Sequence, residues 1–225
     1  MARSIKLSAS LICADLFNLQ EDLSILRQGG FDYIHFDVMD GHFVPGIGLG
    51  TFFLRQIASR QPLLVDVHLM VTDPVQYIAE IADAGASTVT FHYETGKDIY
   101  RTIDCIQNRK MKAGIALRPF TPLCHIEPLL DYLDMILLMA YSPGTTGQSP
   151  VQDFEGRVAA LDELLGQRGQ EHIDIAVDGG VSEESIPKLA KRGANFFVFG
   201  TSGLFMPDRN LDEQVNRIQK IIQGL

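Results

Sequence analysis

The chain has 225 residues, 46% of them hydrophobic and 21% charged, and its 28 acidic and 19 basic residues give a formal net charge of −9. This composition predicts a globular protein with a large core, and it excludes a disordered chain and a small fold stabilised by disulfides. The negative charge argues against binding to nucleic acid or to an anionic membrane, because both need clustered Lys and Arg. Any phosphate group is therefore expected to be held by backbone amides.

The cysteines indicate a reducing compartment. Cys13, Cys105 and Cys124 are odd in number, far apart and without a Cys-x-x-Cys spacing, which predicts free thiols and a cytoplasmic location. No segment approaches the roughly 18 apolar residues that a membrane span needs, and polar residues from Ser8 onward interrupt any signal-peptide core. Neither export nor membrane anchoring is expected.

Short runs rich in β-branched residues alternate with amphipathic segments along the whole chain, and each run precedes a segment that can form a helix. Pro74 predicts the start of a helix that continues through Ala84, and Ser182 with the residues up to Ser185 predicts another helix start. Strands are predicted over residues 5–9, 33–37, 63–70, 88–92, 112–117, 135–141, 174–178 and 196–200.

Three glycines reveal a faint internal repeat. Gly30, Gly85 and Gly193 each occupy a helix C-cap position, followed by a two-residue turn and a strand, with spacings of 55 residues (30 to 85) and 108 residues (85 to 193). These spacings are two and four units of about 27 residues, and eight such units fill the chain. Residues 1–225 are therefore predicted to form a single (β/α)₈ TIM barrel domain, with a doubly wound open sheet as the alternative.

Polar residues close three of the predicted strands. His35 and Asp37 are two apart, so their side chains share a face, while His68 and Asp178 end the third and seventh strands. In such a barrel, reactive groups gather at the C-terminal ends of the strands. Two imidazoles and two carboxylates there predict a site for Zn²⁺, Fe²⁺, Mn²⁺ or Co²⁺. The alternative is that these residues only cap the barrel.

Further polar residues near strand ends are assigned supporting roles. Asp66 lies deeper in its strand than His68, which favours a hydrogen-bonding role over that of a fifth ligand. His92 and Glu94 close the fourth strand and are interpreted in the same way. His42 lies in a loop, where a positional role is expected.

Glycine-rich turns follow the last three strands. Gly-Thr-Thr-Gly-Gln starts at Gly144, Gly179 and Gly180 follow the seventh predicted strand, and Gly200 with Thr201 follows the eighth. Glycine lets the backbone approach an oxygen-bearing ligand closely, and the loops after strands seven and eight form the usual phosphate site of barrel enzymes. The pattern predicts a bound phosphate group.

Residues 35–45 read His-Phe-Asp-Val-Met-Asp-Gly-His-Phe-Val-Pro, and this segment resembles the signature of the ribulose-phosphate 3-epimerase family. The likeness continues in order through residues 8–11, 66–71, 91–94, 177–180 and the turn at Gly200, and so covers essentially the whole chain. It implies a barrel of the ribulose-phosphate-binding type and an isomerase that inverts carbon 3 of a phosphorylated ketose.

The resemblance also implies roles for individual residues. His35, Asp37, His68 and Asp178 would hold one divalent metal ion, and Asp37 and Asp178 would also act as the acid/base pair on opposite faces of the substrate, without a nicotinamide cofactor. Gly144 to Gly147 would form a mobile cover. The implied substrate contacts are Ser10, Met39, His68, Met70, Met139, Gly144, Gly147, Gly179, Gly180, Gly200 and Thr201.

The cover loop departs from the family pattern. Family members commonly read Met-Thr-Val-x-Pro-Gly-Phe-Gly-Gly-Gln there, whereas this chain reads Met-Ala-Tyr-Ser-Pro-Gly-Thr-Thr-Gly-Gln from Met139. The loss of the Phe and of one Gly leaves the size of the substrate open. Residues 52–53, 68–72, 77–79 and 200–205 resemble D-allulose-6-phosphate 3-epimerases, whereas D-ribulose 5-phosphate is the commoner substrate in the family.

Two other classes of function compete with this interpretation. A phosphate-barrel lyase, either a decarboxylase or an aldolase, would carry an Asp-x-Lys-x-x-Asp segment, which is missing from the sequence. A non-catalytic sugar-phosphate binder would lose metal ligands and keep the glycines, but all four candidate ligands are present. The sequence leaves the oligomeric state open, and a homo-oligomer is compatible with it.

Overall fold

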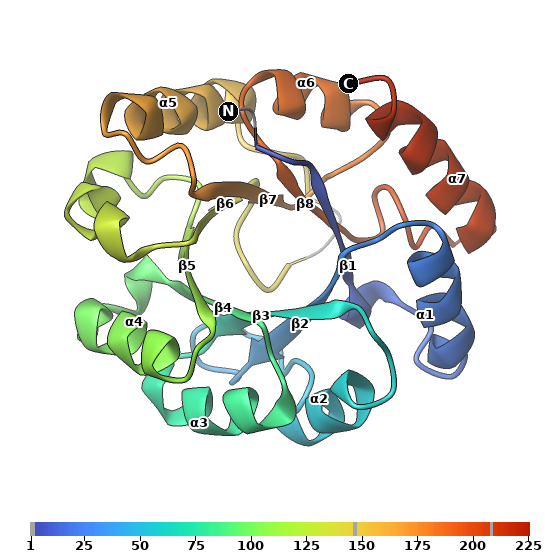
Figure 1. The fold of residues 1–225 in the computed structure, drawn as a ribbon, viewed down its shortest axis with the longest axis horizontal. Helices are drawn as coiled ribbons and strands as arrows, with labels where there is room; N and C mark the ends of the chain where they lie inside the picture. Colours follow the sequence, from blue (N-terminus) through green and yellow to red (C-terminus); the bar gives the residue numbers. More distant parts are fainter. Residues whose placement is uncertain (1–2, 146–147, 208) are drawn as a thin grey trace.

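Eight parallel strands form a closed barrel in chain order, with β8 pairing back to β1 and the helices lying outside (Figure 1). The computed structural model describes residues 3–145, 148–207 and 209–225. The strands are β1 (Lys6–Ser10), β2 (Tyr33–Met39), β3 (Leu64–Met70), β4 (Thr88–His92), β5 (Lys112–Leu117), β6 (Met135–Met139), β7 (Asp174–Asp178) and β8 (Phe196–Phe199). The predicted (β/α)₈ barrel is confirmed, every predicted strand end lies within two residues of the observed one, and the open-sheet alternative is wrong.

Within the described residues, α-helices follow seven of the strands. They are α1 (Leu19–Gln28), α2 (Thr51–Ala58), α3 (Val75–Ala84), α4 (Ile99–Asn108), α5 (Phe154–Gln167), α6 (Ser185–Lys191) and α7 (Leu211–Ile222), together with the 3₁₀ segments η1 (Leu11–Cys13), η2 (Tyr93–Thr95) and η3 (Leu123–Tyr132). The predicted helix from Pro74 through Ala84 is confirmed. No described helix is long and apolar enough to cross a lipid bilayer.

One helix prediction is wrong and another is confirmed. The segment after β5 is the 3₁₀ segment η3, because Pro128 lies inside it and has no N–H for an α-helical bond. The helix start predicted over Ser182 to Ser185 is confirmed, since α6 begins at Ser185 and the Ser182 hydroxyl accepts the Ser185 amide at 3.3 Å.

Alternation along the strands separates two cores. In β2, Ile34, Phe36 and Val38 belong to the cluster that packs between the strands and the helices, whereas Tyr33 belongs to a smaller cluster inside the barrel. His35, Asp37 and Met39 are in phase with Tyr33, so they share its inner face. The same alternation applies to β3 and β7. Polar residues late in these strands therefore lie inside the barrel, toward its C-terminal end.

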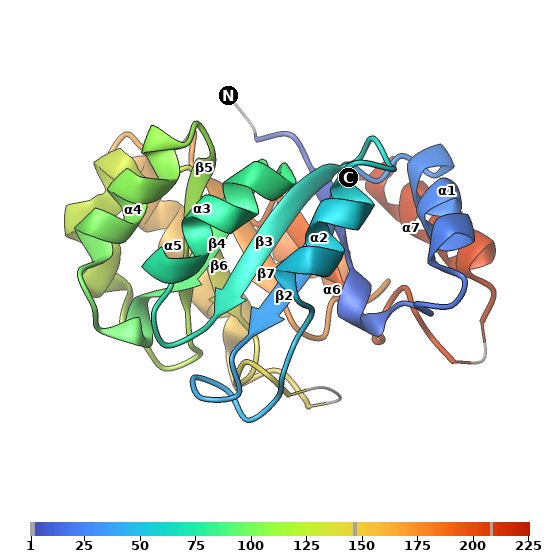
Figure 2. The same ribbon diagram turned by 90° about the horizontal axis from the view of Figure 1, so that it is seen from below.

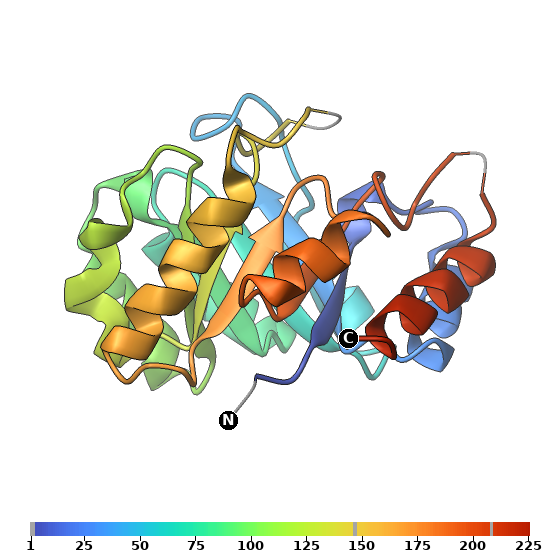
Figure 3. The same cartoon turned by 90° about the horizontal axis from the view of Figure 1, so that it is seen from above.

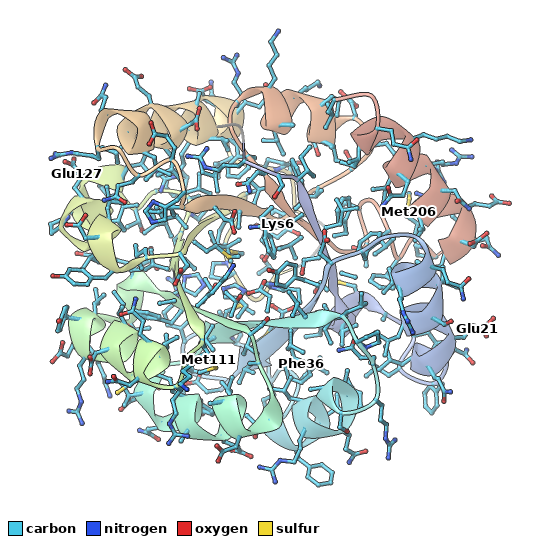
Figure 4. The ribbon with its side chains drawn as sticks, in the orientation of Figure 1. Lys6, Glu21, Phe36, Met111, Glu127 and Met206 are labelled. Carbon is cyan, nitrogen blue, oxygen red and sulfur yellow. The ribbon has the colours of Figure 1, made fainter. Side chains whose placement is uncertain are left out.

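The two ends of the barrel differ. At the N-terminal end the Lys6 ammonium lies 2.5 Å from Asp174, and Figure 4 shows Lys6 near the barrel axis. The loops after β2 and β6 extend from the opposite end, away from the N-terminus, as Figures 2 and 3 show. These two loops approach each other at Gly144 and Val44. The approach is close, since a Cβ atom added to Gly144 would lie 2.5 Å from the Cβ atom of Val44.

Candidate active site

A cavity of about 460 Å³ opens at the C-terminal ends of the strands. His35 and His68 are fully buried and do not line it. Gly147, predicted to contact the substrate, and its neighbour Thr146 lie outside the described residues. The predicted site residues that line the cavity are Ser10, Asp37, Met39, Met70, Met139, Gly144, Asp178, Gly179, Gly180, Gly200 and Thr201.

The structure brings the four predicted metal ligands together. One nitrogen each from His35 and His68 and one oxygen from Asp178 lie within 4.8 Å of one another. Asp37 Oδ1 lies 3.3 Å from His35 Nε2 and 3.4 Å from His68 Nδ1. The other carboxylate oxygen of Asp37, Oδ2, accepts a hydrogen bond of 2.9 Å from the Ser10 hydroxyl.

The buried nitrogens of this cluster have the chemistry that a metal site requires. Among the described residues, His35 Nε2 and His68 Nδ1 have no hydrogen-bond partner, although both imidazoles are fully buried. Buried polar atoms in folded proteins normally have a partner. Two unpartnered imidazole nitrogens that converge with carboxylate oxygens match the donor set of a divalent transition metal. The residues therefore fit such an ion.

A layer of hydrogen bonds holds the two imidazoles from behind. His35 Nδ1 lies 2.7 Å from Asp66 Oδ2, as the supporting role predicted for Asp66 requires. His68 Nε2 lies 3.0 Å from His92 Nε2, and His92 Nδ1 lies 3.1 Å from Glu94 Oε2. Burial lowers the pKa of His92 to about 4 despite its bond to Glu94, so the His92 ring is neutral at pH 7.

The two carboxylates of the cluster titrate in opposite directions. Burial disfavours the ionised form of Asp37, but the attraction of the two neighbouring imidazoles, His35 first and His68 second, outweighs it and holds the pKa of Asp37 far below its ordinary value. Burial raises the pKa of Asp178, and the negative charge of Asp37 adds to the increase. Burial also opposes the charged form of His35, yet Asp37 and Asp66 raise its pKa well above 6.5. Such a split between two carboxylates is typical of acid/base sites.

Glycine turns form one rim of the cavity. Gly179 has a φ of 102°, which few other residues adopt, and a Cβ atom there would lie 2.8 Å from the Tyr141 ring. The amides of Gly179 and Ser202 donate to no backbone carbonyl among the described residues. These amides are therefore available to an anionic group in the cavity.

Sequence reasoning missed several residues of this cavity. Tyr141 lies two residues after Met139, so it was within reach of the alternation argument that placed the other strand-end residues. Burial, together with the charge of Asp178, raises the pKa of Tyr141 to about 12, so its hydroxyl stays protonated. Thr145, part of the predicted cover, also lines the cavity, and the remaining lining residues that were not predicted are Ile12, Cys13, Gly46, Ile47, Val198 and Ser202.

Barrel enzymes carry out their chemistry at this end of the strands, and comparison with known proteins identifies this chain as a sugar-phosphate epimerase, one of the isomerases. Residues 6–205 match the model of the Ribulose-phosphate 3 epimerase family. The chain belongs to this family, as its sequence resemblance predicted.

Curated relatives support this assignment over most of their length. The chain is 37% identical over 205 residues to the ribulose-phosphate 3-epimerase of Bacillus subtilis, covering 91% of this chain and 94% of the relative. It is 34% identical over 218 residues to the Escherichia coli enzyme of the same name, covering 96% of each chain.

Solved structures of other enzymes share the architecture at low sequence identity. KGPDC from Streptococcus mutans superimposes with a TM-score of 0.73 at 14% identity, covering 99% of both chains. A phosphoribosylanthranilate isomerase from Thermotoga maritima has a TM-score of 0.66 at 16% identity, covering 98% of this chain and all of the other. These likenesses show the barrel fold alone.

Proposed function

We propose that the protein inverts carbon 3 of a phosphorylated ketose with the help of one divalent metal ion, with residues 1–225 acting as one catalytic domain. The observation that carries this proposal is the convergence of His35, His68 and Asp178 within 4.8 Å, beside Asp37, at the floor of the cavity. Zn²⁺, Fe²⁺, Mn²⁺ and Co²⁺ all suit this donor set. No step of the reaction requires a nicotinamide.

The two aspartates carry the proton transfers. The proton on carbon 3 is acidic because it lies next to the ketone, and the electron pair of its C–H bond passes into an enediolate when one carboxylate removes it. A metal ion held by His35, Asp37, His68 and Asp178 would supply positive charge that stabilises the negative charge developing on the substrate. The other carboxyl group donates a proton to the opposite face. Asp37 and Asp178 thus exchange protonation states in each turnover, and solvent restores them.

The opposed pKa shifts support this division of work. In the metal-free site Asp37 is held ionised, as a base must be, while Asp178 retains its proton more readily, as an acid must. Ser10 donates to Asp37 Oδ2 and so orients this carboxylate. Met39, Met70 and Met139 line the same cavity and provide a polarizable apolar wall beside the reacting carbon atoms.

The phosphate group is assigned to the glycine rim. Gly179 and Gly180, with the turn at Gly200 and Thr201, line the cavity at the ends of β7 and β8. The overall charge of the protein is −9, so backbone amides rather than a lysine cluster are the natural partners of a phosphate here. Gly144, the first residue of the proposed cover, lines the same cavity.

D-ribulose 5-phosphate is the first substrate to test, because the curated relatives are named ribulose-phosphate 3-epimerase. D-allulose 6-phosphate is the second, on the sequence likeness noted above. Of the segments that carry this likeness, Met70 and residues 200–202 line the cavity, whereas Phe52 is 75% exposed and lines no part of it. A volume of about 460 Å³ accommodates either sugar phosphate.

The test is proton exchange at carbon 3 in D₂O. Metal-reconstituted protein is incubated separately with D-ribulose 5-phosphate and D-allulose 6-phosphate, and the carbon 3 proton is followed by NMR. We expect loss of this proton together with appearance of the epimer, and the faster substrate identifies the branch. Metal-bound protein that exchanges neither proton refutes the proposed reaction for these sugars.

A further inference from the structure

A chain of three side chains, two of them fully buried, runs from the predicted metal site to the loop after β4. His68 and His92 are fully buried, and their Nε2 atoms lie 3.0 Å apart. His92 Nδ1 lies 3.1 Å from Glu94 Oε2. Two facing ring nitrogens at this distance form a hydrogen bond only if one donates a proton and the other accepts it. The direction of this bond decides which nitrogen of His68 carries its proton.

Glu94 determines that direction. Its Oε1 atom accepts hydrogen bonds from the Arg118 amide, at 2.8 Å, and from the Thr121 hydroxyl. These bonds and His92 outweigh burial and lower the pKa of Glu94 to about 2, so the carboxylate has no proton to donate. His92 Nδ1 must therefore be the donor to Glu94.

The remaining protons follow in order. With its proton on Nδ1, a neutral His92 carries a lone pair on Nε2 and accepts from His68 Nε2. A neutral His68 with its proton on Nε2 then carries a lone pair on Nδ1. This is the atom that lies 3.4 Å from Asp37 Oδ1 and has no hydrogen-bond partner among the described residues.

We propose that Glu94 and His92 are positioning residues that fix the tautomer of His68, so that the lone pair of Nδ1 faces the metal site. The inference rests on the metal site of the proposed function. Asp66 serves His35 in the same way but directly, since Asp66 Oδ2 lies 2.7 Å from His35 Nδ1. A carboxylate thus orients each imidazole: Asp66 contacts His35 directly, whereas Glu94 acts on His68 through the His92 imidazole.

A merely structural role for His92 gives a different expectation. The His92 ring lies 4.8 Å from the Phe43 ring, centroid to centroid, so it also fills space beneath the loop after β2. A space-filling ring tolerates either tautomer. Its neighbour Glu94 could then be replaced by Gln, which has nearly the same shape, without any effect on metal binding.

Glu94→Gln reverses the proposed chain without removing volume. The Arg118 amide and the Thr121 hydroxyl both donate to Oε1, so the amide oxygen of the new side chain must take this position. The new NH₂ group then faces His92 Nδ1 and donates to it. His92 must carry its proton on Nε2, where it meets the proton on His68 Nε2. His68 can relieve the conflict only by moving its proton to Nδ1, which removes the metal-facing lone pair.

The first measurement is made on metal-free protein and does not depend on activity. Long-range ¹H–¹⁵N correlation spectra distinguish the two tautomers of a neutral histidine. Replacing the exposed His42, His125 and His172 by Gln simplifies the spectrum to the buried rings. We expect a proton on Nδ1 of His92 and on Nε2 of His68, and a reversed His92 in the Glu94→Gln variant. A wild-type His92 with its proton on Nε2, or a His68 with its proton on Nδ1, overturns the proposal.

The second measurement is Zn²⁺ affinity, obtained by competition with a chromophoric chelator at one pH. Substituting a residue behind a metal ligand typically weakens binding about 10- to 100-fold, and we expect a loss of this size in Glu94→Gln. The control is Glu127→Gln, which makes the same chemical change at a residue on the outer surface of the barrel (Figure 4).

The two proposals fail in distinguishable ways. If wild-type protein binds no Zn²⁺, the proposed metal site fails, whatever the tautomers are. If wild type and both variants bind Zn²⁺ equally well, the metal site stands and the positioning role of Glu94 and His92 is refuted. Because the wild-type spectrum alone tests the tautomers, the proposal can be refuted even if Glu94→Gln does not fold.

Discussion

Replacing each proposed acid/base residue by its amide should separate proton removal from inversion. In Asp37→Asn, only Asp178 remains to exchange protons with carbon 3, and in Asp178→Asn only Asp37 remains. A single carboxylate can remove the proton from one epimer, exchange it with solvent and return a deuteron to the same face. We therefore expect each variant to exchange the carbon 3 proton of one epimer only, and the two variants to act on opposite epimers.

The size of the effect can be estimated from the contacts. Loss of one acid/base group costs about 10²- to 10⁴-fold in rate, or about 2.7 to 5.4 kcal/mol. In Asp37→Asn, the amide oxygen of the new side chain can keep the bond from Ser10 that Asp37 accepts at 2.9 Å, but a charge-assisted bond becomes a neutral one, at a cost of about 1.5 kcal/mol or less. For a chain of 225 residues the change in this one bond lowers Tm by up to about 6 °C, and the loss of the attraction between the Asp37 carboxylate and the buried His35 adds to the decrease.

The assay is NMR in D₂O with each epimer supplied separately. Metal content is measured for every variant, because both aspartates are also proposed ligands, and rates are compared only between metal-loaded samples. Asp104→Asn, at an exposed residue of α4, is the matched control. The two-carboxylate mechanism is refuted if either variant epimerises within tenfold of the wild-type rate, or if both exchange the same epimer.

Three further predictions concern the rim of the site. Asp40 accepts hydrogen bonds from the amide and hydroxyl of Thr72 and has a pKa well below its ordinary value. Asp40→Asn should therefore lower Tm at pH 6, and the difference in Tm from wild type should shrink as the pH falls below about 4. A Tm difference that does not depend on pH would contradict this account. Gly144→Ala places a Cβ atom 2.5 Å from Val44 at a φ of 73°, so it should raise KM while circular dichroism shows an intact fold. The added substitution Val44→Ala should reverse part of the increase in KM, since it removes the clash but not the backbone strain of about 1–2 kcal/mol. Tyr141→Phe removes a hydroxyl from a residue that lines the cavity and should change KM by about threefold to tenfold, as one hydrogen bond is worth about 1 kcal/mol. An unchanged KM for both sugar phosphates would exclude contact between this hydroxyl and the substrate.

The strands and the main residues of the site were predictable because they depend on local periodicity. Two residues that are two apart on a strand share a face, and this was enough to pair His35 with Asp37. That His68 would join them depends on the parallel register, in which Asp37 pairs with His68. The register was not read from the sequence. The register is fixed when the barrel closes. The sequence could therefore predict which residues form the cluster, but not the distances between them.

Features set by side chains from distant strands could not be predicted in the same way. The role of Glu94 depends on donors from Arg118 and Thr121, more than 20 residues further along the chain. The approach of Gly144 to Val44 joins loops about 100 residues apart. The 3₁₀ segment after β5 was in principle visible, because Pro128 is printed in the sequence, but the repeat pattern favoured a helix there.

The loop after β2 is tied to its neighbours at several points, and this bears on how the site selects a substrate. Asp40 bonds to the loop after β3, the Arg118 guanidinium lies 4.5 Å from the centre of the Phe43 ring, and Gly144 packs against the same loop. Ordering a backbone residue costs about 1–2 kcal/mol of conformational free energy. Because these contacts already order the loop, this cost does not arise when substrate binds. A loop held by these contacts cannot easily move to make room for a substrate with one more carbon atom. Discrimination between five-carbon and six-carbon substrates should therefore fall to other residues that line the cavity, and Tyr141 is the largest side chain among them.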